Sequence, residues 1–282
     1  MKARVRRLLL VLAAAALLLD GGLLLAGRLG AASLPKEDTA YFLDVGEGDC
    51  TLLVSGGSTV LVDAGTTEGA PALVRELKSL GVRRLDAVVA THPHADHIGG
   101  MDAVLRTFPV RSFYMSAETQ SDALDAALRR RRLTPRVPYD GETVTLQSGA
   151  SLTFLGPTDD IPSGEINNRS LITLFQTGSA SVLLMGDAEK PAEQSLLRRH
   201  PELRCDILKV GHHGSDTSSS PAFLDVLGAH TAIISCGKDN DYGHPAEQTL
   251  TNLTLVGIRD IRTTAESGTV ALPLIAYKEN AV

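Results

Sequence analysis

Short apolar runs alternate along most of the chain with segments of helical periodicity. Apolar runs bounded by turn residues are typical of buried strands, and they occur at residues 41–45, 50–54, 58–63, 85–90, 110–114, 143–146, 151–155, 170–175, 181–185, 205–210, 230–237, 258–263 and 268–277. Apolar residues at intervals of three and four predict helices at residues 68–80, 101–108, 121–133, 189–200, 246–255 and from 221 onward. This order of strands and helices, in two successive halves, predicts an α/β (α+β) fold.

The first 35 residues have a different pattern from the rest. Basic residues at 2–7 precede an unbroken apolar run at 8–19, Asp20 interrupts it, and small residues follow at 31–33. This pattern predicts an export signal. The alternative is an uncleaved membrane anchor, because the whole apolar segment approaches the roughly 20 residues that span a bilayer. Basic residues ahead of the run predict that the remainder lies outside the cytoplasm.

Composition and charge restrict the class of protein only moderately. With 282 residues, 43% of them hydrophobic, the chain can bury one large core or two small ones. A net charge of −6 argues against a protein that coats nucleic acid through bulk electrostatics. The basic run at residues 129–132 is either a local path for phosphates or the solvated end of a helix. Cys50, Cys205 and Cys236 lack the spacing of a metal site and are expected to be buried thiols.

Four metal-ligating side chains follow directly after the apolar run at 85–90. They are His92, His94, Asp96 and His97, and Gly99-Gly100 comes next. A loop between a buried strand and a helix lies at the carboxyl edge of a sheet, where open α/β sheets place their sites. Imidazole and carboxylate groups suit zinc, iron or manganese. The segment therefore predicts a metal site.

The string His-x-His-x-Asp-His resembles the signature of the metallo-β-lactamase superfamily of metal-dependent hydrolases. Four longer strings are similar to the hydrolase domain at the C-terminal end of ComEC-type DNA-uptake channel proteins: FLDVGEGD (42–49), THPHADHIGG (91–100), INNRSL (166–171) and YGHP (242–245). The resemblance implies a four-layer αββα sandwich, built here from a single domain over residues 36–282. It also implies one or two divalent metal ions as cofactors, Zn²⁺ or Mn²⁺.

The resemblance extends the site beyond the first loop. It implies that Asp187 bridges two metal ions, that His244 completes the second metal site with Asp96 and His97, and that Asp63 orients the ligand histidines. Typical members with two metals carry a third histidine for the first metal, whereas no histidine occurs here between His97 and His200. Asn168 is expected near that position, and this departure favours manganese or a single metal.

The paired histidines His212 and His213 lie between glycines at a strand end, which suits proton transfer. The resemblance implies that one of them is the general acid that protonates the leaving group. We prefer His213, although the sequence leaves both open. Ser215 is a candidate phosphate contact or a helix cap, and Asn240 and Tyr242, which flank His244, are candidate substrate contacts.

These observations predict an exported metal-dependent hydrolase in which Asp96 orients the attacking water. The ComEC-like strings favour a phosphodiester substrate, such as single-stranded DNA, and hence a nuclease. We expect a monomer that is secreted or lies on the outer face of the cytoplasmic membrane, which it contacts through the N-terminal segment if that segment is uncleaved. The alternatives are a lactonase or β-lactamase-type hydrolase, and a non-catalytic binding domain on the cell surface.

Overall fold

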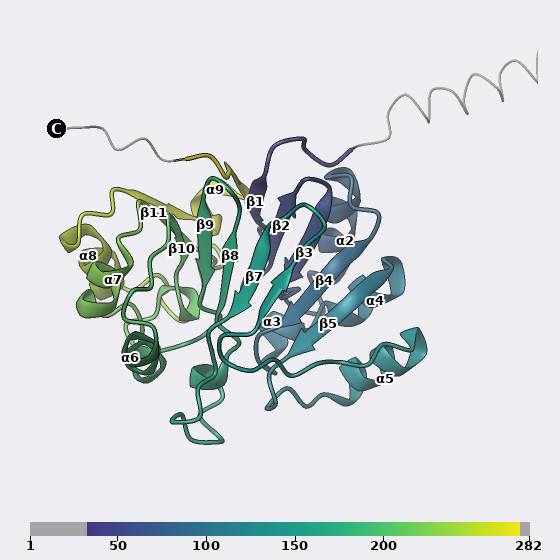
Figure 1. The fold of residues 1–282 in the computed structure, drawn as a ribbon, viewed down its shortest axis with the longest axis horizontal. Coiled ribbons are helices and arrows are strands. Elements are labelled where there is room, and N and C mark those ends of the chain that lie inside the picture. Colours follow the sequence, from purple (N-terminus) through teal and green to yellow (C-terminus); the bar gives the residue numbers. More distant parts are fainter. Residues whose placement is uncertain (1–32, 277–282) are drawn as a thin grey trace, which may run out of the picture.

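The structure is a computed structural model that describes residues 33–276, and two β-sheets pack face to face at its centre (Figure 1). The first sheet has the strand order β13-β1-β2-β3-β4-β5. Its strands are β1 (Thr39–Phe42), β2 (Thr51–Ser55), β3 (Ser58–Val62), β4 (Leu85–Ala90), β5 (Val110–Met115) and β13 (Val270–Pro273). The second sheet has the order β12-β11-β10-β9-β8-β7-β6. Its strands are β6 (Thr143–Thr145), β7 (Ser151–Phe154), β8 (Thr173–Gln176), β9 (Ser181–Leu184), β10 (Ile207–Lys209), β11 (Thr231–Ile234) and β12 (Asp260–Thr263).

Each sheet has an antiparallel part and a parallel part. The pairs β3–β4 and β4–β5 are parallel in the first sheet, and β9 to β12 are parallel in the second. Parallel neighbours need a crossover connection, and each crossover here contains a helix. The α-helices of the described residues, in chain order, are α2 (Ala70–Ser79), α3 (Ala95–Ile98), α4 (Met101–Thr107), α5 (Asp122–Arg131), α6 (Lys190–Arg199), α7 (Pro221–Leu227), α8 (Glu247–Leu255) and α9 (Thr264–Ser267). All but α5 and α9 lie in the crossovers between parallel strands.

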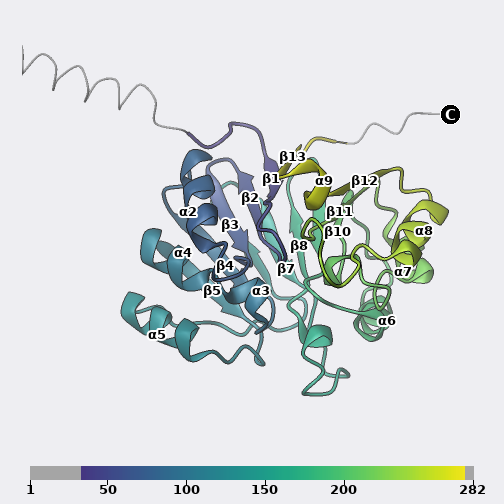
Figure 2. The same ribbon diagram turned by 180° about the vertical axis from the view of Figure 1, so that it is seen from behind.

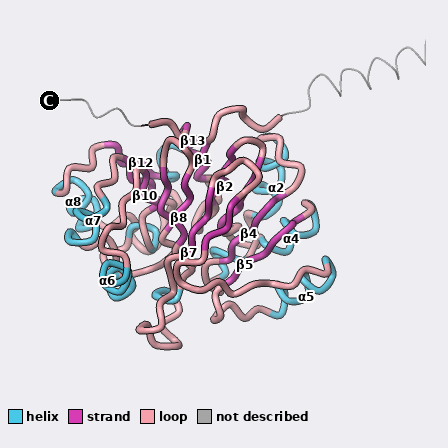
Figure 3. Tube along the Cα trace, in the orientation of Figure 1, coloured by secondary structure: helices cyan, strands magenta, loops and turns pink. Residues whose placement is uncertain are grey.

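Three hydrophobic clusters define four layers. One cluster lies between the sheets, a second lies under α2, α4 and α5, and a third lies under α6, α7 and α8. Strand β4 shows how alternation produces this arrangement, since Ala87 and Val89 face the other sheet while Val88 and Ala90 face the helices. The helices flank the two central sheets on opposite sides (Figures 2 and 3). The predicted αββα sandwich is confirmed.

Several predicted strands are shorter than their apolar runs. The run at 205–210 yields only β10, and the run at 230–237 yields only β11. The first run leaves the sheet one residue early and the second three residues early, and in both places the chain enters a loop at the carboxyl edge. The short helix α9 was not predicted, because its four residues carry no periodic pattern.

The N-terminal signal or anchor lies almost wholly outside the described residues. Within residues 33–276, no helix is both long and apolar enough to cross a membrane.

Candidate metal centre

The loop after β4 packs tightly against the turn that follows β3. A Cβ atom on Gly100 would lie 2.1 Å from the carbonyl oxygen of Ala64, and one on Gly99 would lie 2.5 Å from the backbone nitrogen of Thr67. Only glycine allows so close an approach. The backbone nitrogen of Ala64 also donates to the carbonyl of His97 at 2.7 Å. The glycine pair thus lets α3, which carries Asp96 and His97, lie directly over the end of β3.

Asp63 lies beneath this loop and is 1% exposed. Its carboxylate accepts hydrogen bonds from the backbone nitrogen of Thr91 at 2.9 Å, from Thr91 Oγ1 at 2.7 Å and from His97 Nδ1 at 2.7 Å. Because a carboxylate in these bonds is an acceptor, His97 carries its proton on Nδ1 and directs Nε2 away from Asp63. Asp63 therefore contacts the site as the resemblance implies.

His92 is oriented in the same way through Thr91. The Thr91 hydroxyl donates to Asp63, so its oxygen accepts from His92 Nδ1, which lies 3.0 Å away. His92 Nε2 then faces His94 Nδ1 at 3.0 Å and Asp187 Oδ2 at 3.4 Å. His92 is buried and His94 is exposed. These three side chains form one group of closely spaced ligand atoms.

A second group consists of Asp96, His97, Asp187 and His213, whose ligand atoms all lie within 4.8 Å of one another. His213 Nδ1 donates to the carbonyl of Ser235 at 2.9 Å, so its Nε2 faces the cluster. That atom lies 3.2 Å from His97 Nε2 and 3.2 Å from Asp96 Oδ2. Asp187 belongs to both groups, consistent with the bridging position that the resemblance implies.

The donor set of the second group fits a divalent cation. Two imidazole nitrogens point at each other, and Asp187 Oδ1 is buried without a hydrogen-bond partner although His97 Nε2 lies 3.1 Å away. A cation between these atoms would satisfy all of them, and nitrogen and carboxylate ligands suit zinc or manganese. Together the groups offer two adjacent cation positions that share Asp187.

The charges within the cluster stabilise one another. Burial alone would raise the pKa of Asp187, but His97 and His213 hold it well below its ordinary value. Burial likewise opposes protonation of His97, yet the carboxylates of Asp187 and Asp63 raise its pKa well above the usual range. For Asp96 the hydrogen bond with His213 outweighs burial and lowers the pKa to about 2.

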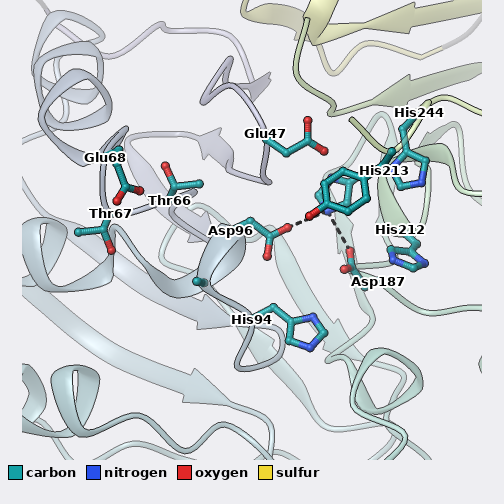
Figure 4. A pocket seen from close by; sticks show the side chains of 12 residues that line it. Glu47, Thr66, Thr67, Glu68, His94, Asp96, Asp187, His212, His213 and His244 are labelled. Atoms are coloured by element: carbon teal, nitrogen blue, oxygen red, sulfur yellow. Dashed lines mark ion pairs between the residues drawn. The ribbon is translucent and has the colours of Figure 1, made fainter. Parts of the chain in front are cut away.

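The cluster lies in the wall of a pocket of about 620 Å³. Figure 4 shows Asp96, Asp187 and His213 converging, with His94 on one side and His212 and His244 on the other. The lining is completed by Glu47, Thr66, Thr67, Glu68, Ala95 and Tyr242. Asp96 is only partly buried, so the cluster is open to a molecule in this pocket.

His244 does not occupy the position that we expected for it. The structure brings His213, and not His244, next to Asp96 and His97. The His244 ring lies parallel to the His213 ring with centroids 6.2 Å apart, and Tyr242 stacks at 5.7 Å from His244. Burial, followed by the neighbouring His213 and His212, lowers the pKa of His244. His244 therefore lies beside the cluster and lines the pocket, where it can contact a bound molecule.

The loop around His244 is held by Asn240. The amide of Asn240 donates to the carbonyls of Gly237 and His244 and accepts from the backbone nitrogen of His244. Asn240 thus organises the loop, whereas the Tyr242 ring is 73% exposed and free to contact a ligand.

Of the paired histidines, only His213 belongs to the group of converging ligand atoms, whereas His212 lines the pocket beside it. His212 Nδ1 lies 3.1 Å from Glu189 Oε1 and 3.0 Å from Thr217 Oγ1. Ser215 Oγ also contacts Thr217 Oγ1, at 3.0 Å, within the same turn. Helix α7 begins after Ser220, so Ser215 is not its cap.

Asn168 has structural contacts that hold the start of α6. It is 4% exposed, and its Oδ1 accepts from the backbone nitrogens of Glu189 and Ala192 at the start of α6. Its amide nitrogen donates to Glu165 and Glu189. With both ends of its amide engaged in holding α6, Asn168 has little capacity left for a metal.

Sequence reasoning missed four residues that support the cluster: Asp49, Thr91, Lys209 and Ser235. A lysine inside the apolar run at 205–210 was a signal that could have been used, because a buried lysine needs a partner.

Arg130, in the basic run at 129–132, forms an ion pair with Asp102 on α4. All four arginines of that run are exposed at the end of α5.

Two curated proteins are similar in sequence to most of this chain. ComE operon protein 3 of Bacillus subtilis is 30% identical over 259 residues, which cover 84% of this chain and 33% of that protein. Competence protein ComA of Neisseria gonorrhoeae is 32% identical over 246 residues, covering 86% of this chain and 33% of that protein. The chain therefore spans about a third of the length of these curated relatives.

A solved structure shares the fold at low identity. The metallo-beta-lactamase fold protein YhfI of Bacillus subtilis superposes with a TM-score of 0.57 and 13% identity, covering 84% of this chain and all of that one. The family model of the metallo-beta-lactamase superfamily matches residues 43–238, from the loop after β1 to the loop after β11. The chain belongs to the metallo-beta-lactamase superfamily and is related to the ComEC-like competence proteins.

Proposed function

We propose that this protein is a metal-dependent hydrolase that cleaves phosphodiester bonds, with single-stranded DNA as its substrate. One observation carries the proposal: three members of the ligand group, Asp96, Asp187 and His213, line a pocket of about 620 Å³ in a chain related to competence proteins. The pocket volume falls within the range of small-molecule sites, about 300–1,000 Å³. It can therefore hold one or two residues of a polymer.

The chain's own residues would hold the metal ions as two sets. Asp96, His97 and His213 would hold one cation, His92 and His94 the other, and Asp187 would contact both. A bound divalent cation makes a water acidic enough to attack near neutral pH and stabilises the negative charge that develops on the attacked group. Asp63 keeps the Nε2 atom of His97 directed at the cluster.

Proton transfer is the task that we assign to Asp96 and His244. The partly exposed carboxylate of Asp96 accepts a hydrogen bond from the attacking water and orients it. His244, rather than His213, donates a proton to the leaving oxygen, because its ring lines the pocket beside the cluster while His213 belongs to the group of converging ligand atoms.

A nucleic-acid substrate is supported by two observations. Competence proteins from two bacteria match most of the chain at 30% and 32% identity. In addition, the exposed ring of Tyr242 lines the pocket and offers a flat face on which a base can stack.

The basic N-terminal residues followed by an apolar run support action outside the cytoplasm. Fractionation of cells that produce the full chain tests this location.

The test is cleavage of a labelled single-stranded DNA by the full chain with Mn²⁺ or Zn²⁺. The variant Asp96→Ala/His97→Ala removes two cluster residues, and His200→Ala, at the end of α6, serves as the matched control. We expect cleavage by the wild type and by His200→Ala, and none by the double variant. A wild type that binds metal yet cleaves no DNA would refute the nuclease assignment. A parallel panel of lactones and β-lactams tests the alternative substrates.

A further inference from the structure

A buried ion pair lies directly below the metal cluster. Lys209 Nζ lies 2.6 Å from Asp49 Oδ2, and the two side chains are 1% and 6% exposed. Lys209 Nζ also donates to the carbonyl of Val210 at 3.1 Å. Removing two charges from water carries a desolvation penalty that often exceeds their mutual attraction, so a buried pair is weak support for a purely stabilising role. Its contacts point to a different one.

The pair joins the two sheets at the edge that carries the site. In β10, Ile207 faces the core between the sheets, and because side chains alternate along a strand Lys209 faces the same way. Asp49 comes from the loop between β1 and β2 of the first sheet. The ammonium of one sheet therefore contacts the carboxylate of the other.

On the side of the first sheet, Asp49 is connected to the loop that carries Asp96. The backbone nitrogen of Asp49 donates to the carbonyl of Asp96 at 3.1 Å, and the carbonyl of Asp49 accepts from Gly65 at 2.9 Å. The approach is so close that a Cβ atom on Gly48 would lie 2.4 Å from the Asp96 carbonyl oxygen. Any movement of Asp49 is thus passed to the backbone of Asp96.

On the side of the second sheet, Asp49 is connected to His213 through Ser235. The Ser235 hydroxyl donates to Asp49 Oδ1 at 3.2 Å, and the Ser235 carbonyl accepts from His213 Nδ1 at 2.9 Å. Asp49 uses its other carboxylate oxygen for Lys209. Asp49 therefore connects cluster residues from opposite sheets, Asp96 through its backbone nitrogen and His213 through its carboxylate and Ser235.

We propose that Asp49 and Lys209 form a positioning pair that holds Asp96 and His213 at the separation at which they bind one divalent cation. This inference rests on the metal binding of the proposed function but not on its substrate. Lys209 opposes the effect of burial and lowers the pKa of Asp49, which keeps the carboxylate charged for both contacts.

The test is a titration of the metal-free full chain with Co²⁺, followed by its visible absorption, which reports the number and arrangement of ligands. The variant Asp49→Leu/Lys209→Met replaces both charges by apolar groups of similar size, so that neither is left unpaired. We expect it to fold but to bind Co²⁺ about 10- to 100-fold more weakly, the usual effect of losing a group that orients a metal ligand, with an altered spectrum.

Two further variants distinguish positioning from folding. Asp206→Asn removes a carboxylate from the opposite end of β10, where it accepts from the Ser181 backbone and hydroxyl, each at 2.7 Å. This control should lower the melting temperature and leave Co²⁺ binding unchanged. Ser235→Ala removes only the link between Asp49 and the His213 loop and should weaken Co²⁺ binding several-fold without unfolding the protein.

Each outcome decides the proposal. A double variant that binds Co²⁺ as tightly as the wild type would overturn it. If the double variant does not fold, Ser235→Ala decides, and unchanged Co²⁺ affinity in that variant would overturn the proposal as well. A wild type that binds no Co²⁺ would overturn the proposed function and this inference together, whereas Co²⁺ binding without DNA cleavage would overturn only the nuclease assignment.

Discussion

At the scale of single residues, the partner of one ring nitrogen determines what each histidine can do. In His92, His97 and His213 the Nδ1 atom is bonded to Thr91, Asp63 and Ser235 respectively, which directs Nε2 at the cluster. His244 Nδ1 is buried without a hydrogen-bond partner. His244 is therefore held by its loop and by ring stacking instead.

This difference predicts separate effects of His213→Ala and His244→Ala. Loss of His213 removes one of the side chains that we expect to hold a cation together with Asp96 and His97. We therefore expect that metal ion and the activity to be lost together. Loss of His244 should leave metal content unchanged and lower kcat by about 10²–10⁴-fold, the usual contribution of a general acid. Metal analysis and steady-state kinetics on both proteins check this.

Equal metal loss in the two variants would contradict the assignment and return His244 to the ligand set. A reduced kcat in His244→Ala that recovers with small acidic buffers would support proton donation.

A second prediction at this scale concerns Asp63→Asn. The carboxylate accepts three hydrogen bonds, two of them at Oδ2. Whichever way the new amide points, its nitrogen faces a donor. We expect a loss of about 1–3 kcal/mol in the free energy of unfolding and about 10- to 100-fold weaker metal binding. Denaturant unfolding of the metal-free protein and a metal titration measure the two effects separately, and unchanged metal affinity would rule out an orienting role.

At the scale of elements, α6 shows how a helix is fastened beside the site. Asn168 accepts hydrogen bonds from its first turn. Near its end, Asp160 accepts from Ser195 Oγ at 2.5 Å and forms an ion pair with Arg198. The helix is thus held at both ends by the loop between β7 and β8.

The hydrogen bond from Ser195, with those from Thr158 and Arg198, lowers the pKa of Asp160 below its ordinary value. A depressed folded-state pKa contributes stability above the unfolded pKa of about 4, and that stability is lost as the pH falls. We expect Asp160→Asn to lower the melting temperature at pH 6 more than at pH 3. Thermal unfolding of both proteins over this range checks it. An equal difference at both pH values would show that the Asp160 charge contributes nothing, as salt screening can cause at an exposed site.

At the scale of the whole molecule, the core between the sheets sets the distance between the two halves of the site. Phe175 is fully buried in that core, together with Phe154 and Tyr114. The ligands come from both sheets, because Asp96 and His97 follow β4 whereas Asp187 follows β9. Sheet packing and metal binding are therefore coupled.

We expect Phe175→Ala to cost about 3–5 kcal/mol of unfolding free energy, because it leaves a cavity between the sheets. Tyr242→Ala, which changes a ring that is 73% exposed, should alter stability by less than about 0.5 kcal/mol. Chemical denaturation of both variants tests this. A cost below about 1 kcal/mol for Phe175→Ala would mean that the core collapses around the change.

Much of this molecule could be predicted from local patterns. The apolar runs predicted the strands, and His92, His94, Asp96 and His97 were singled out because ligand-type residues followed a buried strand, whereas Asp187 came from the family resemblance. Local patterns gave less information about Asn168 and His244. Their roles depend on which backbone groups and rings lie next to them, and spacing along the chain carries no information about those neighbours.

The sequence by itself determined the order of strands and helices, the glycine pair and the metal loop, since periodicity and residue type act over a few neighbouring positions. Only the tertiary structure decided that His213 joins Asp96 and His97 and that a buried Asp49–Lys209 pair lies below them. These contacts join segments more than 100 residues apart. Their geometry exists only after the two sheets have packed, because sheet packing sets which side chains meet.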